Sequence, residues 1–421
     1  FYNVHYPTDY FKRNGVVPKF YFIVDRIDLL DQASREFRSR GLVVHTVNTR
    51  DEFAADIKSN VAIHNDAGKP EITVVNIQRF KDDPDVARST DYALGMQRIY
   101  FLDEVHRSYN PEGSFLANLN QSDPDAIKIG LTGTPLLKGS LSARQGVDGQ
   151  PKEKQIYNSR ALFGDYIHKY YYNRSIADGY TLRLIREEVE TKYKLELKEA
   201  LEQIKVLPGM NNRALLYAHD KFVEPMLVYI VDDFQSLRAM RNDNTTGAMV
   251  ICDSADQAKN MARIFEAKYG GVVPNPPTEP VVLDRVAETA PQYAVSDHAI
   301  RTHALILHDV GTKQERKDKV EEFKDGKINI LFVYNMLLTG FDASRLKKLY
   351  LGRIIKAHNL LQALTRVNRP YKSFRYGFVV DFVDIEKEFE KTNQDYFDEL
   401  QSELGDELEN YSDLFKTEAE I

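Results

Sequence analysis

The chain has 421 residues, of which 43% are hydrophobic and 28% are charged, and its formal net charge is −7. This length predicts two or three domains, and the composition indicates a globular protein with a sizeable core rather than a disordered chain. The single cysteine, Cys252, excludes a disulfide framework and a cysteine-based zinc site, and we expect it to be a small core residue. No apolar run reaches membrane-spanning length and no signal peptide is visible, so we expect a cytoplasmic protein without membrane contact.

The charge is unevenly distributed along the chain. Residues 386–421 carry 13 acidic residues and 3 lysines, a net charge of −10, which leaves +3 for residues 1–385. Binding to nucleic acids depends on local basic patches more than on total charge. The negative total therefore does not exclude a nucleic-acid partner.

The first part of the chain alternates between apolar runs and amphipathic segments, which predicts an α/β domain over residues 1–184. We expect strands at residues 19–24, 42–44, 72–75, 99–102 and from 127, and helices at 25–40 and from 51. Residues 137–160 are rich in Gly, Ser, Lys and Gln, which indicates a loop. The tyrosine-rich run 168–174 favours a strand that packs one face on a core, and stacking of its rings on nucleic-acid bases is the alternative.

One strand of this domain ends in two acids. The apolar run Ile99–Leu102 reads as a buried strand and is followed directly by Asp103 and Glu104. In open α/β sheets, ligands bind beyond the carboxyl ends of the strands. One carboxylate there can hold Mg²⁺ and its neighbour can orient a water that attacks a phosphate. The plainer alternative is a strand that merely ends in polar residues. A second strand, which begins at Ile127 and ends in a Thr/Gly/Pro turn, follows at the distance that a βαβ unit requires.

The second part of the chain predicts a helical connector and another α/β domain. Residues 185–246 contain two helical patterns, 187–204 and 222–240, for which a partner-binding arm is the less favoured interpretation. Residues 247–385 carry five short apolar runs, at 248–252, 304–307, 328–333, 349–351 and 377–382, that predict strands. Helices are expected from Ser254 to 268, at 313–323 and at 359–369. The acidic extension 386–421 is helical in period.

The last of these predicted helices carries a basic pattern. Gln362, Arg366 and Arg369 are spaced i, i+4 and i+7, so a helix over 359–369 would place them on one face. Guanidinium groups on such a face can stabilise the charge that develops on a transferred phosphate. The alternative is a solvated basic helix face, which is common.

Six short segments together resemble one family. FLDEVHRS (101–108) and GLTGTP (130–135) resemble motifs II and III of superfamily 2 helicases and translocases, and the form DEVHRS points to the motor (R) subunit of type I restriction enzymes. LLTGFD (337–342) and QALTRVNR (362–369) resemble motifs V and VI. FIVDRIDLLDQ (22–32) and NIQRF (76–80) resemble motifs Ia and Ib. The motifs occur in family order across about residues 20–385, which is more specific than any single match.

The resemblance implies two RecA-like parallel-sheet α/β domains in tandem, with ATP between them and duplex DNA as the track. It implies that Asp103 coordinates Mg²⁺, that Glu104 positions water, and that Arg366 and Arg369 stabilise the transition state. The remaining implied nucleotide-site residues are His106, Thr132, Thr134, Gly340, Asp342 and Gln362. The implied DNA-binding residues are Arg26, Gln78, Arg79 and Thr339. The implied partners are double-stranded DNA and the methyltransferase and specificity subunits of a type I restriction complex, in which ATP hydrolysis drives translocation along duplex DNA before cleavage.

Two parts of the family pattern are absent from this sequence. The Gly-Lys pairs at Gly68-Lys69-Pro70 and Gly326-Lys327-Ile328 lack the Ser/Thr and the strand–loop–helix order of a phosphate-binding loop. No convincing nuclease site is visible either. We therefore expect an N-terminally shortened motor that does not hydrolyse ATP by itself. A superfamily 2 translocase without restriction activity and a non-enzymatic DNA-binding remnant are the alternatives.

Overall fold

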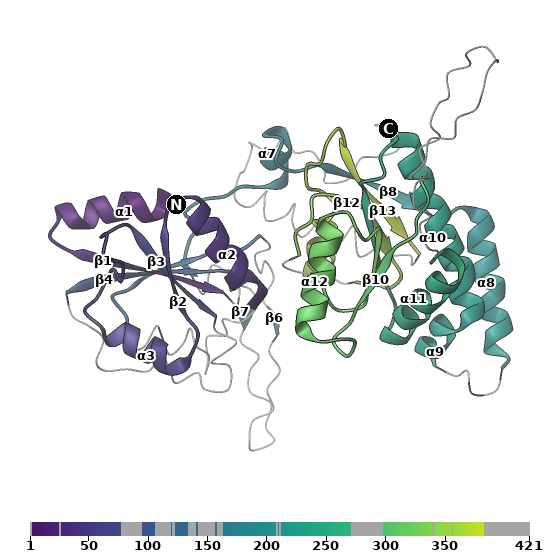
Figure 1. Cartoon of the computed structure of the whole chain (residues 1–421), viewed down its shortest axis with the longest axis horizontal. Coiled ribbons are helices and arrows are strands. Elements are labelled where there is room, and N and C mark those ends of the chain that lie inside the picture. The colour runs from purple at the N-terminus through teal and green to yellow at the C-terminus, as the bar shows by residue number, and fades with distance from the viewer. Residues whose placement is uncertain are drawn as a thin grey trace, which may run out of the picture. The chain divides into compact units, whose positions relative to one another are not determined.

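The computed structural model describes residues 2–24, 27–76, 95–105, 119, 123–133, 140–141, 156–157, 163–207, 209, 212–270, 298–338, 341–355 and 357–382. The chain divides into two compact units, Phe1–Lys169 and Tyr170–Ile421. Each unit is built on its own parallel sheet (Figure 1). None of the described helices is long and apolar enough to cross a membrane.

The first unit contains a five-stranded sheet in the order β2-β3-β1-β4-β5, and all of its strands are parallel. The strands are β1 (Val17–Val24), β2 (Val43–Val47), β3 (Glu71–Asn76), β4 (Met96–Leu102) and β5 (Ile127–Gly130). A two-stranded antiparallel pair, β6 (Ser140–Leu141) and β7 (Ile156–Tyr157), lies in the region predicted to be a loop.

Helices cover both faces of this sheet (Figure 1). They are α1 (Tyr2–Arg13), α2 (Ile27–Ser39) and α3 (Arg50–Lys58). Because side chains alternate along a strand, Tyr21 and Ile23 pack with Phe53 of α3, whereas Phe20 packs on the opposite face with Val4 of α1. The sheet is thus buried on both sides, which explains its continuous apolar strands.

The second unit contains a six-stranded parallel sheet in the order β10-β11-β9-β12-β13-β8. Its strands are β8 (Arg183–Glu188), β9 (Gly247–Ile251), β10 (His303–Ile306), β11 (Ile330–Val333), β12 (Leu346–Leu351) and β13 (Tyr376–Asp381). Its helices are α7 (Tyr172–Ala177), α8 (Thr191–Lys205), α9 (Arg213–Ala218), α10 (Asp220–Arg241), α11 (Ala255–Tyr269), α12 (Lys313–Lys324) and α13 (Ala357–Leu364). The two parallel sheets confirm the predicted fold class.

The two faces of the second sheet carry different helices. Val250 and Phe332 face a core formed with α8, α10 and α11, whereas Met249 and Leu331 face a core formed with α12 and α13. Ser254 accepts a hydrogen bond from the main-chain N–H of Gln257 and begins α11, as predicted. Cys252 is fully buried, which confirms its expected place in the core.

The organisation around residue 184 differs from the prediction. We expected a domain end at 184 and a helical connector from 185, but residues 183–188 form β8, which pairs with β13 at the edge of the second sheet. The charges in this strand concealed it. They are neutralised within the fold, because Arg186 lies 3.1 Å from Asp381 and Glu187 pairs with Lys348. The helices of the expected connector, α8 and α10, pack on the second sheet.

The tyrosine-rich run was also predicted wrongly. Residues 168–174 were expected to form a strand, but residues 168–171 form no strand and α7 begins at Tyr172. A turn follows this helix, and in it Gly179 has a φ of 77°. The predicted helical extension 386–421 lies outside the residues that the structure describes.

Candidate functional site

The carboxyl end of β4 holds the first group of candidate residues. β4 lies between β1 and β5, and Ile23, Leu102 and Gly130 are in register at the ends of the three strands. The main-chain N–H of Asp103 donates to the carbonyl of Ile23 at 2.9 Å, so the backbone that carries the acids is fixed to the sheet. Both acidic side chains are partly buried at this edge.

Glu104 adopts an unusual backbone conformation. Its φ is 50°, in the left-handed region that residues other than glycine rarely occupy. The next residue, Val105, donates its N–H to the carbonyl of Leu131 at 3.2 Å, so the chain turns sharply across the end of β5. Strained backbone of this kind concentrates at functional sites, where the surrounding structure holds it in place.

Two further polar residues lie at the same edge of the sheet. Thr132 follows β5 and is partly buried, and Asn76, fully buried, ends β3 in register with Val24. Carboxylate and hydroxyl oxygens at one edge suit a hydrated Mg²⁺, which prefers oxygen ligands and keeps several waters. The residues that the structure describes here therefore fit Mg²⁺, although the sequence contains no phosphate-binding loop. His106 and Thr134 lie outside the described residues.

The candidate residues of the second unit do not share one helix face, which corrects the prediction. The helix α13 ends at Leu364, five residues before Arg369. The chain then continues in tight turns, in which Arg366 and Val367 donate their N–H groups to the carbonyls of Ala363 and Leu364. Pro370 follows at once, and residues that precede proline avoid the helical conformation. The spacing i, i+4, i+7 therefore does not place Arg366 and Arg369 on one helix face with Gln362.

Arg366 joins two of the segments that resemble motifs. Its Nε donates to the main-chain carbonyl of Gln362 at 2.8 Å, and its Nη1 donates to the main-chain carbonyl of Phe341. Gln362 itself is almost fully buried. The guanidinium thus connects the end of α13 to the loop that precedes β12.

Arg369 lies close to Asp342 of the same loop. Its Nε is 3.5 Å from a carboxylate oxygen of Asp342, and the two side chains are 49% and 41% exposed. An exposed ion pair of this length contributes little to stability. The guanidinium of Arg369 therefore has the freedom to exchange Asp342 for an anionic ligand. Thr339 and Gly340, in the same loop, lie outside the described residues.

Lys347 is a buried residue of this region that sequence reasoning missed. It lies in β12, and its ammonium donates to the main-chain carbonyls of Val367 and Arg369, which fixes the turn after α13. Burial, and then the positive charge of Arg369, lowers the pKa of Lys347 to about 7. Two adjacent lysines in the strand LKKLYL indicate an exposed strand, yet Lys347 and Lys348 are both buried.

The predicted DNA-binding residues of the first unit follow β1 and β3 in the sequence. Arg26 is the second residue after β1, and Gln78 and Arg79 are the second and third residues after β3. All three lie outside the residues that the structure describes. Their expected contacts with DNA therefore remain predictions.

Comparison with known proteins gives two family matches. Residues 6–210 match the SWI2/SNF2 ATPase family, and residues 281–384 match domain 3 of the type I restriction enzyme subunit R. A solved structure, the ATP-dependent type ISP restriction-modification enzyme LlaBIII bound to DNA, is 10% identical with a TM-score of 0.54. The match covers 87% of this chain and 24% of the LlaBIII chain, and it supports the fold alone.

Curated relatives match most of the chain. The type I restriction enzyme HindI endonuclease subunit of Haemophilus influenzae is 25% identical over an alignment of 403 residues, and the match covers 90% of this chain and 35% of the relative. The type I restriction enzyme SauMSSORF170P endonuclease subunit of Staphylococcus aureus is 26% identical over an alignment of 391 residues, and the match covers 88% of this chain and 39% of the relative. The chain thus spans little more than a third of the length of these relatives. These matches confirm the resemblance inferred from the motifs: the chain is similar to the SWI2/SNF2 ATPase family and to the endonuclease subunits of type I restriction enzymes.

Proposed function

We propose that this chain is the motor region of a type I restriction R subunit, in which ATP hydrolysis drives translocation along duplex DNA. The observation that carries the proposal is the position of Asp103 and Glu104 at the carboxyl end of β4, between the parallel strands β1 and β5. This edge is where open α/β sheets bind ligands. The strained backbone of Glu104 supports a functional role rather than a strand that merely ends in polar residues.

The proposed roles in the first unit follow from the chemistry of the side chains. Asp103 would hold Mg²⁺, and Glu104 would orient the attacking water and accept its proton. With ATP as the donor of the phosphoryl group, a Mg²⁺ ion held by Asp103 would supply positive charge near the transferred group. Thr132 and Thr134 would link the state of the nucleotide to contacts with DNA, and His106 would lie at the nucleotide.

The two arginines of the second unit have different roles in this proposal. Arg369 is half exposed and pairs only at 3.5 Å with Asp342, so it is the group that can reach a phosphate. The guanidinium of Arg366 is engaged with main-chain carbonyls and would position the loop that holds Thr339, Gly340 and Asp342. Gln362, whose main-chain carbonyl accepts one of these hydrogen bonds, is almost fully buried and would be a positioning residue as well.

The relatives support the proposed DNA substrate and partner subunits. The relatives are endonuclease subunits of type I restriction enzymes, and the LlaBIII structure is described as bound to DNA. We infer that this chain acts on double-stranded DNA, together with methyltransferase and specificity subunits, in the cytoplasm. Arg26, Gln78, Arg79 and Thr339 would contact the phosphates of the DNA backbone, which gives affinity without sequence preference.

The test is ATP hydrolysis by the protein expressed from its complete gene, with and without linear duplex DNA. Glu104→Gln should lower DNA-stimulated turnover by about 100-fold or more, because a positioned general base contributes at least that much. The control is Glu199→Gln on the exposed side of α8, which should leave turnover unchanged. Retention of more than about a tenth of wild-type turnover by Glu104→Gln would remove this residue from the proposed role. Absence of turnover in the wild type would instead favour the non-enzymatic remnant.

A further inference from the structure

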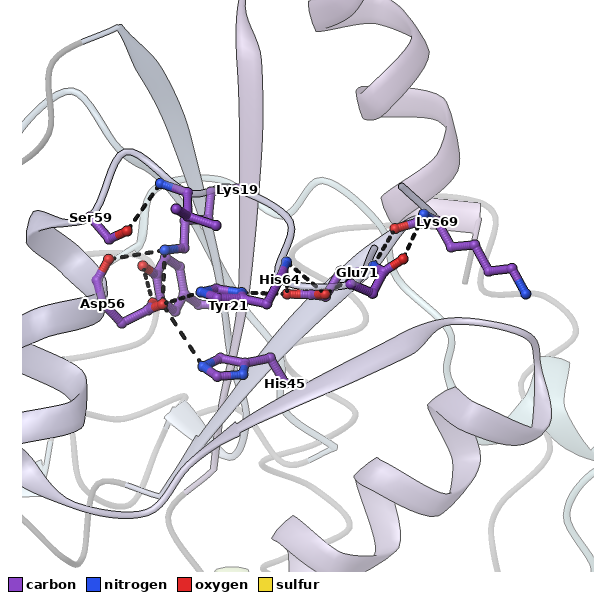
Figure 2. Close-up of polar contacts among 10 residues, drawn as sticks. Lys19, Tyr21, His45, Asp56, Ser59, His64, Lys69 and Glu71 are labelled. Atoms are coloured by element: carbon purple, nitrogen blue, oxygen red, sulfur yellow. Dashed lines mark hydrogen bonds and ion pairs between the residues drawn. The ribbon is translucent and has the colours of Figure 1, made fainter. Parts of the chain in front are cut away.

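A second cluster of polar side chains lies in the first unit, away from Asp103 and Glu104. It comprises His45 of β2, Asp56 of α3 and His64 of the loop between α3 and β3 (Figure 2). One ligand atom from each of the three residues lies within 4.8 Å of the others. The cluster occupies the face of the sheet that α3 covers, near the amino-terminal halves of the strands.

The two imidazoles face the same carboxylate oxygen. The Nε2 of His64 is 3.3 Å from Oδ1 of Asp56, and the Nε2 of His45 is 4.0 Å from the same atom. The Asp56 side chain is 4% exposed, whereas His64 and His45 are 29% and 34% exposed. The carboxylate is thus at the buried end of the cluster and the imidazoles open toward solvent, which leaves a path for an ion.

Glu71 determines which nitrogen of His64 is available. Its carboxylate lies 2.6 Å from Nδ1 of His64 and also accepts the main-chain N–H of His64. An ionised carboxylate only accepts hydrogen bonds, so Nδ1 carries the proton and Nε2 of the neutral ring presents a lone pair to Asp56. A lone pair and a carboxylate oxygen at 3.3 Å repel each other unless a cation lies between them. A metal ion bound between the two atoms would remove this repulsion.

We propose that His45, His64 and Asp56 form a binding site for a divalent transition-metal ion, with Zn²⁺ as the best-fitting ion. Two imidazole nitrogens and one carboxylate oxygen are a typical zinc ligand set, whereas Mg²⁺ prefers oxygen ligands. Glu71 supplies the second-shell contact that zinc-binding histidines commonly make through their other nitrogen. The ionised Asp56 and Glu71, set against the ammonium of Lys19, give the cluster a net charge of −1, which favours a cation.

The cluster must rearrange slightly to bind the ion. The two imidazole rings are stacked, with centroids 4.0 Å apart and planes 14° from parallel, so their lone pairs do not yet converge. His64 is held by Glu71, but His45 lies in the edge strand β2 and is free to tilt its ring toward Asp56. The Lys19 ammonium, 2.9 Å from Oδ1, also bonds to the main-chain carbonyl of Asp56 and can retain that contact. Its charge keeps the affinity moderate.

The proposed ion would connect three elements of the first unit: β2, α3 and the loop before β3. It would therefore stabilise this end of the sheet. It is separate from the Mg²⁺ that we assign to Asp103, and it does not depend on the proposed motor function.

The test is calorimetric titration of the untagged protein with Zn²⁺. We expect one ion per chain, with an affinity in the micromolar range. His45→Ala and His64→Ala should each weaken binding by about tenfold or more, and Glu71→Gln by less. His308→Ala, at an exposed position of the second unit, is the matched control and should bind as the wild type does.

Two results would overturn the proposal. One is the absence of saturable Zn²⁺ binding by the wild type, which needs no variant. The other is unchanged affinity in His45→Ala and His64→Ala proteins whose circular dichroism matches that of the wild type. If a variant does not fold, the visible absorption of Co²⁺ bound to the wild type decides the question: bands of nitrogen and oxygen coordination support the site, and the spectrum of hydrated Co²⁺ contradicts it.

Discussion

Substituting Arg366 and Arg369 separately should have opposite consequences for stability and for catalysis. Arg366→Ala removes two charge-assisted hydrogen bonds, to the carbonyls of Gln362 and Phe341, each worth about 1.5–3 kcal/mol when buried. Because Arg366 is only partly buried, water recovers part of this, and we expect a loss of about 2–4 kcal/mol in the free energy of unfolding of the second unit. Arg369→Ala removes one exposed ion pair with Asp342 and should cost about 0–1 kcal/mol.

The catalytic effects should rank in the other order. Arg369→Ala should lower DNA-stimulated ATP hydrolysis by about 10³-fold or more, as expected for an arginine that contacts the transferred phosphate, and ATP binding should remain measurable. Arg366→Lys keeps the charge but not the geometry of the fork, so it should recover only part of the stability. Urea unfolding followed by circular dichroism gives the stabilities, and phosphate release gives the rates. Two results would refute the structural role of Arg366: equal losses of stability in the two alanine variants, or an unfolding free energy of Arg366→Ala within about 0.5 kcal/mol of the wild-type value.

Three further predictions concern packing, pH and DNA. A Cβ added at Gly377 would lie 2.3 Å from the carbonyl oxygen of Val367, so Gly377→Ala should lower the unfolding free energy by about 1–3 kcal/mol, whereas Gly133→Ala, with open space around it, should not. Burial lowers the pKa of Lys347 to about 7, so above that pH the unfolded state binds more protons than the folded state. The free energy of unfolding should therefore rise between pH 7 and 9 in the wild type but not in Lys347→Met. Parallel pH profiles of the two proteins in urea titrations would contradict this. Arg79→Ala should weaken binding of unrelated duplex 30-mers equally and reduce the salt slope by about 1 in fluorescence anisotropy, and a sequence-dependent loss would argue against a phosphate contact.

The sheets were predictable because their strands are buried on both faces. The run Ile99–Leu102 contains no polar residue, so it identified β4, although Arg98 and Gln97 extend the strand further back. The charge of Arg98 argued against a buried strand position, but inside the fold Asp123 neutralises this charge at 2.5 Å. The same reason explains β8, whose charges pair with β12 and β13.

The geometry of the arginines could not be predicted from spacing. The pattern of Gln362, Arg366 and Arg369 fits a helix as well as it fits a helix that ends early. The turn that follows the helix is held by Lys347, which is distant in sequence and whose ammonium donates to the carbonyls of Val367 and Arg369. A buried lysine in a strand is visible only once the surrounding elements are in place.

The histidine cluster was likewise invisible in the sequence. His45, Asp56 and His64 come from a strand, a helix and a loop, and their spacing matches no short metal-binding motif. They meet because β2 and β3 are neighbours and α3 crosses between them. The single cysteine excludes a cysteine-based zinc site, but it does not exclude a site built from histidines and a carboxylate.

Displacement of a triplex-forming oligonucleotide from linear duplex DNA measures movement of the protein along the DNA. The protein is expressed from its complete gene and combined with its methyltransferase and specificity subunits. We expect ATP-dependent displacement after a delay that grows linearly with the distance between the starting site and the triplex, and no displacement with Glu104→Gln. ATP hydrolysis without displacement, or displacement whose delay is independent of distance, would contradict translocation.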